Sequence, residues 1–384
     1  MTYQELIDLG ITAREQTEPE KCLAYSGQAF IVNPDGAAAF NNYGNTLREM
    51  GQPQRAIPFL QHAVLLDPSM DTAKFNLAVA TLLAGDLKTG MIQYESRWNF
   101  EHLQGLLPKF SQPAWRGEDL TDKTIMVLGE QGHGDVLHFS RFVAELKKYN
   151  PKKICFQVGP DMIELMQSSK IFQGIEVSDY PNGAVFDTWS MLMSLPIGLN
   201  KDYSNLNSPL QYLDAPQRCI KEWHERLGTK TRQRIGIGWS GRRDTWINRH
   251  KAVKFENMVN LIRRNPDHQW INLQADATEE ENSVLTELGV DQYPNTIKDW
   301  SDTAGLIHHL DLVIGVDTSI SHLAGAMGKP LWVMLPQYAL DWRWLLDRDD
   351  SPWYPSAKLF RQPVRGDWNS VIDKITQYLS WWKN

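Results

Sequence analysis

Residues 311–335 have the order of apolar and polar residues that builds a parallel β-α-β unit. Apolar runs at Leu312–Gly315 and Leu331–Leu335 predict two buried strands. Between them, residues 324–326 are small enough for a helix to pack closely against a sheet. Parallel strands need a crossover of this kind, and helices usually cover both faces of their sheets. The segment therefore predicts an α/β domain.

The turn between the first of these strands and the helix is predicted to bind an anion. It contains Asp317, Thr318 and Ser319, where free backbone N–H groups and the positive end of the helix dipole converge. His322 follows about one turn later and is predicted to point back toward the same anion. The segment alone is equally compatible with a plain structural role, in which Thr318 or Ser319 caps the helix and His322 is a hydrogen-bonded core histidine.

Composition limits the classes of protein to which the chain can belong. Its 384 residues are 42% hydrophobic and 22% charged, which is sufficient for two or three packed domains. A formal net charge of -7 argues against general nucleic-acid binding, so an anion site must be local. The three scattered cysteines indicate neither a disulfide framework nor a metal site. No signal-like N-terminus and no apolar run of membrane-spanning length is present, and we expect a cytoplasmic protein without an integral membrane segment.

The first hundred residues repeat with a period of 34. Gly10, Gly44 and Ala78 fall in register, and Pro34 and Pro68 close consecutive units. A generic helical bundle explains apolar periodicity but not small residues at this fixed spacing. The pattern resembles the tetratricopeptide repeat, in which large and small residues lock pairs of antiparallel helices together. We expect residues 1–102 to form a short helical solenoid.

After Glu101 the pattern changes to alternating strands and helices, which predicts parallel sheets. We place two α/β domains there, at residues 103–230 and 231–384. In addition to the two strands named above, the expected strands are Thr124–Leu128, Ile154–Val158, Ala184–Asp187, Arg234–Trp239 and Gln269–Leu273.

A glycine-rich loop follows the first of these strands. Gly132 and Gly134 allow close approach of a ligand, and Asp135 lies at the start of the next helix, at the carboxyl end of a strand. A helix-capping role is the alternative for Asp135. The dinucleotide-binding pattern lacks its third glycine, with Leu137 in that position, so a nicotinamide dehydrogenase is not indicated. No Gly-Lys-Ser or Gly-Lys-Thr follows, which also excludes a P-loop.

The ordered motifs together resemble those of bacterial tetratricopeptide-containing glycosyltransferases related to the heptosyltransferases and, more distantly, to O-GlcNAc transferase. The resemblance covers most of the chain. The motifs are Glu130–Asp135, Gly238–Gly241, Asn272–Gln274, Asp302–Ala304, Val316–Gly325, Asp341–Trp344, Trp353–Pro355 and Leu359–Gln362. The resemblance implies a GT-B architecture, with two Rossmann-like domains facing a cleft and the nucleotide-sugar held mainly by the C-terminal one. It also implies that neither a metal ion nor another cofactor is needed.

The resemblance assigns roles to individual residues. Asp135 matches an aspartate that acts as general base on the acceptor hydroxyl, a task for which a carboxylate within hydrogen-bond reach is suited. Thr318 and Ser319 match a phosphate-binding turn that stabilises the departing diphosphate, and His322 fits the same task. Lys251 aligns approximately with a basic position that contacts phosphate.

Several further positions keep two interpretations each. Trp239 and Ser240 line the diphosphate or sugar pocket, or form a strand-end turn with a core tryptophan. Gln274 meets the base or ribose, or is a surface glutamine. Arg343 contacts an anion, or is a stacked structural arginine. The positions expected on the acceptor side of the cleft are Gln131, Gly132, His133, Gly134 and Arg343.

The expected function is transfer of a sugar from a nucleotide-diphosphate sugar to a hydroxyl group, with inversion and without a metal. The repeats would recruit a protein, peptide or glycan acceptor, or a separate protein partner. Two alternatives stay open. One is a sugar-nucleotide epimerase or phosphorylase of the same fold, and the other is a non-catalytic scaffold that only binds a nucleotide.

Overall fold

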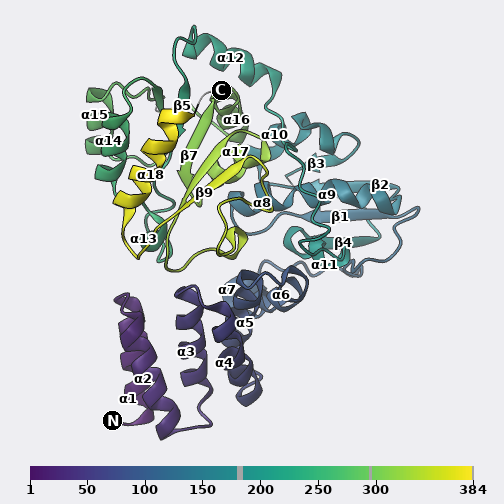
Figure 1. The fold of residues 1–384 in the computed structure, drawn as a ribbon. Helices are drawn as coiled ribbons and strands as arrows, with labels where there is room; N and C mark the ends of the chain where they lie inside the picture. Colours follow the sequence, from purple (N-terminus) through teal and green to yellow (C-terminus); the bar gives the residue numbers. More distant parts are fainter. Residues whose placement is uncertain (180–184, 294–295, 383–384) are drawn as a thin grey trace. The chain divides into compact units, whose positions relative to one another are not determined.

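The computed structural model describes residues 1–179, 185–293 and 296–382 (Figure 1). Its internal contacts divide the chain into two compact units. Unit 1 comprises Met1–Ser111, Asn200–Leu206 and Gln337–Asp347. Unit 2 comprises Gln112–Leu199, Asn207–Pro336 and Arg348–Asn384. Two short segments from the region that the sequence pattern assigns to the α/β domains thus belong to the unit that holds the repeats.

Unit 1 begins with three pairs of consecutive helices, as the 34-residue period predicts. The helices are α1 (Tyr3–Glu15), α2 (Pro19–Val32), α3 (Ala37–Glu49), α4 (Pro53–Leu66), α5 (Asp71–Leu83) and α6 (Leu87–Tyr94), followed by η1 (Glu95–Asn99) and α7 (Glu101–Gln104). Each odd-numbered helix among the first six packs against its successor.

Small residues allow the two helices of a pair to pack at a short distance. A Cβ built on Gly44 in α3 would lie 2.7 Å from Cγ of Leu60 in α4, so only glycine permits this approach. Pro19 and Pro53 each occupy the first turn of the second helix of a pair, where the missing N–H of proline costs no hydrogen bond. The residues that recur in the sequence therefore mark the positions where helices begin and where paired helices touch.

Unit 2 contains two parallel sheets. The first has the order β3-β2-β1-β4 and the second the order β6-β5-β7-β8-β9, and every pair of neighbouring strands is parallel. The strands are β1 (Thr124–Leu128), β2 (Lys153–Gln157), β3 (Glu176–Ser178), β4 (Thr188–Met191), β5 (Arg234–Ile237), β6 (Gln269–Asn272), β7 (Leu312–Val316), β8 (Leu331–Leu335) and β9 (Ala357–Arg361).

One strand prediction was wrong. The strand expected at Ala184–Asp187 is found at Thr188–Met191, and Ala184 lies outside the described residues. Polar side chains of this strand form hydrogen bonds to the preceding loop. Thr188 Oγ1 donates a 2.8 Å hydrogen bond to the carbonyl of Pro113. Trp189 Nε1 donates another, of 2.9 Å, to the carbonyl of Gln112. A search for an apolar run misses a strand stabilised in this way.

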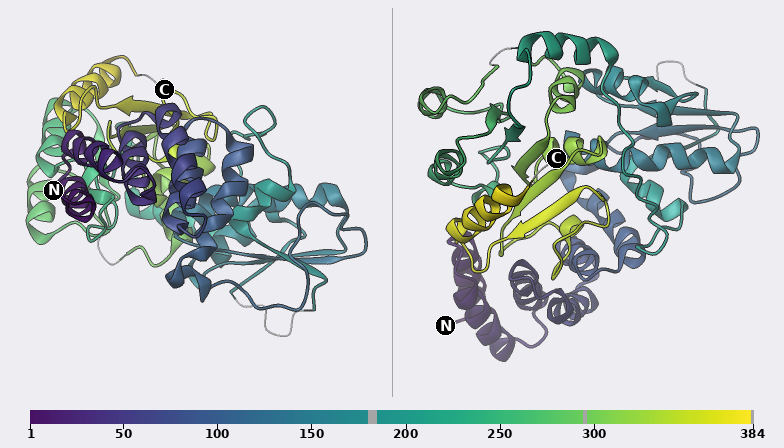
Figure 2. Two further views of the ribbon diagram at one scale, coloured as in Figure 1. Left: turned by 90° about the horizontal axis from the view of Figure 1, so that it is seen from below. Right: turned by 45° about the horizontal axis from the view of Figure 1, so that its top comes forward.

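Helices flank the second sheet on both sides (Figure 1). On one side α14 (Phe255–Arg264) packs against α18 (Trp368–Trp381), and their apolar residues share a core with the strands. Both views of Figure 2 show α18, in yellow, at this position. On the other side lie α16 (Trp300–His308) and α17 (Ser319–Ala326).

The remaining helices of unit 2 have at most 11 residues each in the described ranges. They are α8 (His133–Phe139), α9 (Arg141–Glu145), η2 (Leu146–Tyr149), η3 (Pro160–Met162), α10 (Ile163–Ser168), η4 (Lys170–Phe172), η5 (Leu192–Ser194), α11 (Leu195–Gly198), α12 (Gln217–Leu227), α13 (Asn248–Lys251) and α15 (Glu279–Glu287). The helix η6 (Trp342–Trp344) belongs to unit 1.

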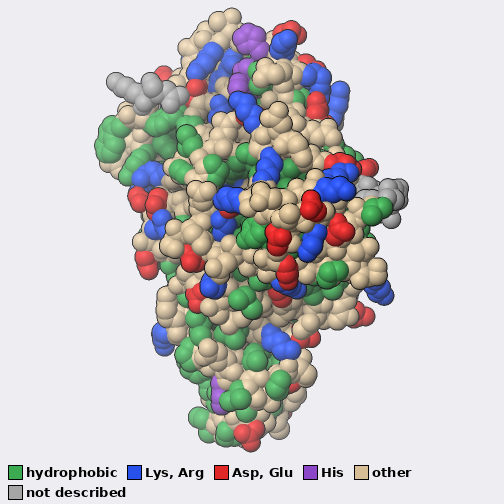
Figure 3. Space-filling view, turned by 90° about the vertical axis from the view of Figure 1, so that its right-hand side faces the viewer, with side chains coloured by type: hydrophobic (Ala, Val, Ile, Leu, Met, Phe, Trp, Pro, Cys, Tyr) green, Lys and Arg blue, Asp and Glu red, His purple; other side chains and the backbone are tan. Residues whose placement is uncertain are grey.

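The charged side chains, the cysteines and the apolar helices can now be compared with what the composition predicts. Acidic side chains, in red, and basic ones, in blue, are interspersed on the face shown in Figure 3. Cys22, Cys155 and Cys219 are buried free thiols. Of the helices in the described ranges, none combines the length and the apolarity needed to cross a bilayer.

Candidate functional site

The N-termini of α8 and α17 lie against each other in unit 2, although they follow strands of different sheets. A Cβ built on Gly134 in α8 would lie 3.1 Å from Cδ2 of His322 and 3.3 Å from Oγ of Ser319. The glycine-rich loop and the predicted anion-binding turn therefore meet at one place. Gly134 is the contact point, and its missing side chain allows the approach.

Asp135 is the third residue of α8. Its Oδ2 accepts a 3.1 Å hydrogen bond from the backbone N–H of Gly132, which is the N-cap residue. Asp135 is therefore not itself the N-cap, and it occupies the position from which a side chain bonds back to the start of the helix. The carboxylate is partly exposed, and the hydrogen bond from Gly132 holds it at the first turn of α8.

The two neighbours of Gly132 have different surroundings. Gln131 has a φ of 60°, so the chain reverses sharply at this exposed residue. His133 Nε2 lies 3.0 Å from the Asp161 carboxylate, and its ring centroid is 5.3 Å from that of Trp300. The His133 side chain thus extends toward η3 and α16.

The N-terminus of α17 has the features of an anion site. Thr318 is the N-cap residue, but its hydroxyl does not cap the helix and instead donates to the carbonyl of Val316 at 3.4 Å. Ser321 Oγ donates to the same carbonyl at 2.6 Å. Within the three described ranges, the backbone N–H groups of Ser319 and Ile320 find no acceptor. Two donors at the positive end of the helix dipole are thus available to an anion.

Lys251 brings a positive charge to this turn. Its Nζ donates a 2.6 Å hydrogen bond to the backbone carbonyl of Asp317 and lies 3.5 Å from the carboxylate of the same residue. Lys251 belongs to α13 and is 66 residues from Asp317 in the sequence. The fold of the second α/β half brings the two residues together. The structure thus places the side chain beside the predicted phosphate turn.

His322 has protein partners on both ring nitrogens. Its Nδ1 lies 2.8 Å from the hydroxyl of Tyr354, and its Nε2 lies 3.5 Å from Oδ1 of Asp317. The side chain is buried and lies behind the turn. This geometry matches the hydrogen-bonded core histidine more closely than a histidine that points at the anion.

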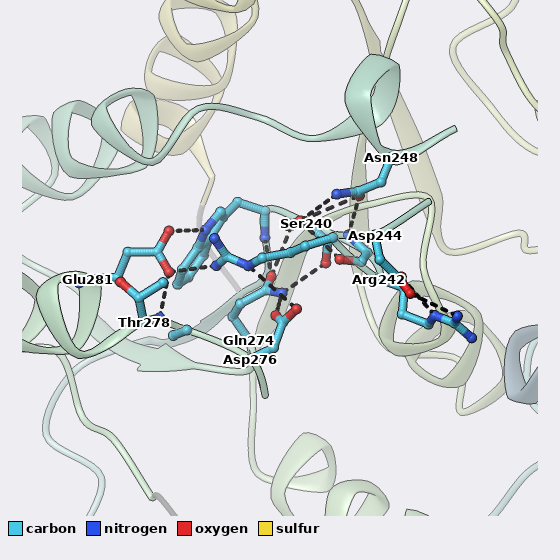
Figure 4. A network of polar contacts seen from close by, with 12 residues as sticks. Ser240, Arg242, Asp244, Asn248, Gln274, Asp276, Thr278 and Glu281 are labelled. Carbon is cyan, nitrogen blue, oxygen red and sulfur yellow. Dashed lines mark hydrogen bonds and ion pairs between the residues drawn. The ribbon is translucent and has the colours of Figure 1, made fainter. Parts of the chain in front are cut away.

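Gln274 organises the loop after β5 (Figure 4). Its Oε1 accepts hydrogen bonds from the backbone N–H groups of Trp239, at 3.0 Å, and Ser240, at 2.9 Å. Its Nε2 donates to the carbonyl of Ser240 at 3.0 Å and to the carboxylate of Asp276. Gln274 is buried, so the interpretation as a surface glutamine was wrong. The Trp239 side chain is also buried, in the core beside Phe255, which matches the strand-end turn.

Asn248, which the sequence analysis did not single out, completes this loop. Its Oδ1 accepts a 2.7 Å hydrogen bond from the N–H of Gly241, and its Nδ2 donates to Oγ of Ser240 at 3.0 Å. The residue that follows, Arg249, opens the basic stretch before Lys251. The loop is therefore fixed by amide side chains from two sides.

Arginines extend this network at the surface (Figure 4). Arg243 pairs with Glu281 at 2.6 Å and lies 3.4 Å from Asp276. Arg242 pairs with its near neighbour Asp244 at 3.0 Å. The local sequence, rich in arginine, is thus balanced by acidic partners.

A pocket of about 440 Å³ opens next to the turn. Asn272 and Gln274 line it from the end of β6, Trp300 from α16 and Ile320 from the first turn of α17. The pocket therefore adjoins the same helix N-terminus that presents the two available N–H groups. Its mixed apolar and amide lining suits a flat polar ring system.

Arg343 belongs to unit 1. Its Nη1 is 3.2 Å from the Asp341 carboxylate, and its guanidinium lies 4.5 Å from the ring centroid of Trp342. The side chain is buried. These contacts match the stacked structural arginine.

The sequence analysis missed three buried polar residues behind the site, His138, Arg141 and Tyr354. Tyr354 Oη lies 2.8 Å from Nδ1 of His138. Arg141 donates to the carbonyl of Trp353 at 2.6 Å and to Oη of Tyr212 at 2.8 Å. One available signal was that Tyr354 lies inside one of the motifs, Trp353–Pro355. Among the described residues, no cluster of three or more metal-ligating side chains occurs.

Comparison with known proteins gives one relative by sequence and several by fold. No protein-family model matches the chain. The chain is 23% identical over 445 residues to Protein FlbA of Caulobacter vibrioides, an alignment that covers 97% of this chain and 72% of that protein.

Solved structures resemble the α/β part. A glycosyl transferase family 9 structure from Veillonella parvula matches with a TM-score of 0.50 and 12% identity, over 70% of this chain and 92% of that one. The E. coli ADP-heptose LPS heptosyltransferase II matches with a TM-score of 0.49 and 13% identity, over 67% of this chain and 97% of that one. The first likeness shows that the greater part of the chain shares the fold of a family 9 glycosyltransferase.

Proposed function

We propose that the chain is a glycosyltransferase of GT-B architecture that moves a sugar from a nucleotide-diphosphate sugar to a hydroxyl acceptor. The observation that carries this proposal is the contact of Gly134 with Ser319. It brings the carboxylate-bearing start of α8 to the N-terminus of α17, whose first N–H groups are available to an anion. A base and a phosphate site are thus neighbours, as transfer from a diphosphate requires.

The start of α17 serves the leaving group. As the glycosidic bond breaks, its electron pair goes to the diphosphate oxygen, which gains negative charge. The N–H groups of Ser319 and Ile320 and the ammonium of Lys251 are suited to stabilise that charge. These fixed donors supply the stabilisation that a metal ion provides in other enzymes, so the proposed reaction is metal-independent.

Asp135 serves the acceptor. The acceptor hydroxyl gives its proton to the carboxylate while its oxygen forms a bond to the anomeric carbon. The hydrogen bond from Gly132 orients the carboxylate, and a carboxylate can accept several hydrogen bonds at once. Attack opposite the leaving diphosphate inverts the anomeric configuration.

The pocket beside Ile320 serves the nucleoside. It adjoins the proposed diphosphate site through the first turn of α17. Its volume of about 440 Å³ accommodates a base and part of a ribose. The repeats of unit 1 serve to recruit a protein, peptide or glycan acceptor, or a partner protein, since stacked helix pairs form extended binding surfaces.

A donor panel tests the proposal. Transfer and hydrolysis are measured with UDP-, GDP- and ADP-sugars, and a CMP-sugar serves as a donor without a diphosphate. Asp135→Asn keeps an oxygen for the Gly132 N–H but cannot take a proton, so we expect turnover to fall by about 10²- to 10⁴-fold with unchanged nucleoside diphosphate affinity. Unchanged turnover would remove Asp135 from the mechanism.

The same panel separates the alternatives. An epimerase changes the donor without any hydroxyl acceptor, and a phosphorylase does so only when inorganic phosphate is added. A scaffold binds nucleoside diphosphate and shows no turnover with any donor, in the wild type as well as in Asp135→Asn. Acceptor-dependent product formation supports the transferase alone.

A further inference from the structure

A second pocket in unit 2, of about 710 Å³, lies at the opposite ends of two helices that reach the candidate site. The first residue of α16, Trp300, lines the pocket beside the turn, and its last residue, His308, lines the second pocket. In the same way, Ile320 in the first turn of α17 lines the former, and Met327, directly after that helix, lines the latter. Helices of this length are about 12–14 Å long, so the two pockets are separate.

The connection between β4 and β5 runs along the second pocket, and Asp214 of this connection lines it. The backbone N–H groups of Tyr212 and Leu213 donate to the carbonyl of Ala326 at the end of α17, at 2.8 and 3.0 Å. The N–H of Asp214 donates to Oγ of Ser169, before β3, at 2.9 Å. The connection is thus bonded to both α/β halves of unit 2, which fixes this wall of the pocket.

Lys329 brings a half-buried positive charge to the pocket. Its Nζ donates to the backbone carbonyl of His308 and, at 3.2 Å, to that of Leu310. An ammonium group has three N–H donors, so these bonds hold the group in place and leave one donor. Burial lowers the pKa of Lys329 below its ordinary value of 10.5, and the attraction of Asp311 does not offset this effect. The charge is thus compensated only in part, and an anion in the pocket would stabilise it.

A second lysine, Lys170, lines the pocket from the other half of unit 2. It precedes β3 of the first sheet, whereas Lys329 precedes β8 of the second. Of the described residues that line the pocket, Asp214 alone is acidic. Its Oδ2 accepts the backbone N–H of Lys170 at 2.9 Å, and its Oδ1 accepts from Nε2 of Gln211 at 2.8 Å. Both carboxylate oxygens therefore already have donors, and the pocket carries a net positive charge.

We infer that the second pocket binds a phosphate monoester, whose phosphate group is held by Lys170 and Lys329. A phosphate monoester carries a charge of about −1.5 to −2 at neutral pH, which suits two ammonium groups. Lysine binds phosphate as a point charge, whereas a carboxylate is best matched by the fork of an arginine, and no arginine is among the described residues of this lining. The volume also accommodates the organic part of the ester, against apolar side chains such as Ile220 and Met327.

Methyl NMR signals of the full chain report on each pocket separately. Labelling with ¹³C-methyl methionine and isoleucine provides signals from Met327 and Ile320, which Met327→Leu and Ile320→Val serve only to assign. The probes are inorganic phosphate, glucose 6-phosphate and AMP, with glucose as the control without phosphate. We expect at least one of the two esters to shift the Met327 signal saturably, and glucose to leave it unchanged. A Met327 signal that responds to neither ester, or equally to glucose, overturns the inference.

Lys170→Gln removes one of the two charges. We expect the dissociation constant of the bound ester to rise about tenfold or more, which corresponds to one lost bond to a charged group, with an unchanged melting temperature. Lys152→Gln is the matched control, because it makes the same change at an exposed lysine that does not line the pocket. Equal dissociation constants in the two variants contradict the role of Lys170.

The second site and the proposed function fail separately, because the Met327 signal does not depend on sugar transfer. A chain whose Met327 signal responds to an ester, but which transfers no sugar from any donor, contradicts the proposed function and supports the second site. A chain that transfers sugar, while its Met327 signal responds to neither ester, contradicts the second site alone.

Discussion

The hydroxyl of Tyr338 donates a 2.7 Å hydrogen bond to the carboxylate of Glu49, across 289 residues of sequence. Glu49 ends α3 and its side chain is fully buried, with Arg14 at 2.6 Å and Arg48 at 3.2 Å. The neighbouring Ala339 donates its backbone N–H to the carbonyl of Glu49 at 2.7 Å. The segment Gln337–Asp347 is therefore joined to the repeats at Glu49, through the buried carboxylate and the backbone carbonyl of that residue.

Glu49→Gln should destabilise unit 1 strongly. The amide retains the shape but leaves the Arg14 and Arg48 charges without their counter-charge, and breaking a buried ion pair on one side costs about 3–5 kcal/mol. Because Arg14 is partly exposed, we expect the loss of unfolding free energy to lie near the lower end of that range. Urea titrations measure this loss. The matched control is Glu18→Gln, which breaks an exposed pair with Lys21 and should change stability by less than about 0.5 kcal/mol.

The same carboxylate predicts a pH dependence. Burial by itself raises the pKa of Glu49, but the attraction of Arg48 and the hydrogen bond from Arg14 outweigh it, and the net pKa lies below the ordinary value of 4.5. A folded pKa below the unfolded one gives stability that is present above about pH 4.5 and is lost as the pH falls through the folded pKa.

Melting temperatures of the wild type and Glu49→Gln measured from pH 7 to pH 3 check this prediction. Their difference should be constant near neutral pH and shrink below about pH 4.5. Burial raises the pKa of Tyr338, so its hydroxyl remains a donor throughout this range. A difference that grows toward low pH contradicts the assignment.

The local pattern of the sequence predicted the elements better than the contacts between them. Apolar runs identified the strand Leu312–Val316 and its neighbours, because burial on both faces of a parallel sheet leaves a continuous signal. The repeat predicted the helix pairs, because Gly44 marks a contact that any copy of the unit needs. The bond between Tyr338 and Glu49 has no such local signal, and neither does the inclusion of Gln337–Asp347 in unit 1.

Polar residues at strand ends were the least predictable part of the site. A glutamine after a strand has the same sequence signature whether it faces a ligand, solvent or a neighbouring loop. Only the pairing of β5 with β6 brings the amides of Trp239 and Ser240 within reach of Gln274. Similarly, Tyr354 and His138 are 216 residues apart, and their contact depends on how α8 meets α17.

Gly134→Ala should impair turnover with little change in stability. Alanine favours the helix by about 0.5–1 kcal/mol over glycine, but its methyl group would lie 3.1 Å from His322 and 3.3 Å from Ser319. The two helix starts must separate by a few tenths of an ångström, and we expect turnover to fall about tenfold, since small misplacements of reacting groups are costly. Gly105→Ala is the control, because no atom lies within 4 Å of its added Cβ. Equal turnover of the two variants contradicts a shared site at Gly134.

Gln274→Glu should loosen the loop after β5 although the side chain keeps its shape. The carboxylate still accepts from the N–H groups of Trp239 and Ser240, but it cannot donate to the carbonyl of Ser240, and it places a second negative charge beside Asp276. Unsatisfied buried acceptors cost about 1–3 kcal/mol, so we expect the unfolding free energy to fall by about 2 kcal/mol.

Gln157→Glu provides the comparison for that measurement, because its amide donates one exposed hydrogen bond of 3.0 Å to the carbonyl of Asp179. We expect its unfolding free energy to change by less than about 0.5 kcal/mol. The pH dependence then separates the two causes of the Gln274→Glu defect. Protonation of the new carboxyl group at low pH restores a donor and removes the repulsion from Asp276, so the defect should shrink as the pH falls. A defect that is independent of pH would mean that packing, and not the donated hydrogen bonds, makes Gln274 necessary for the loop.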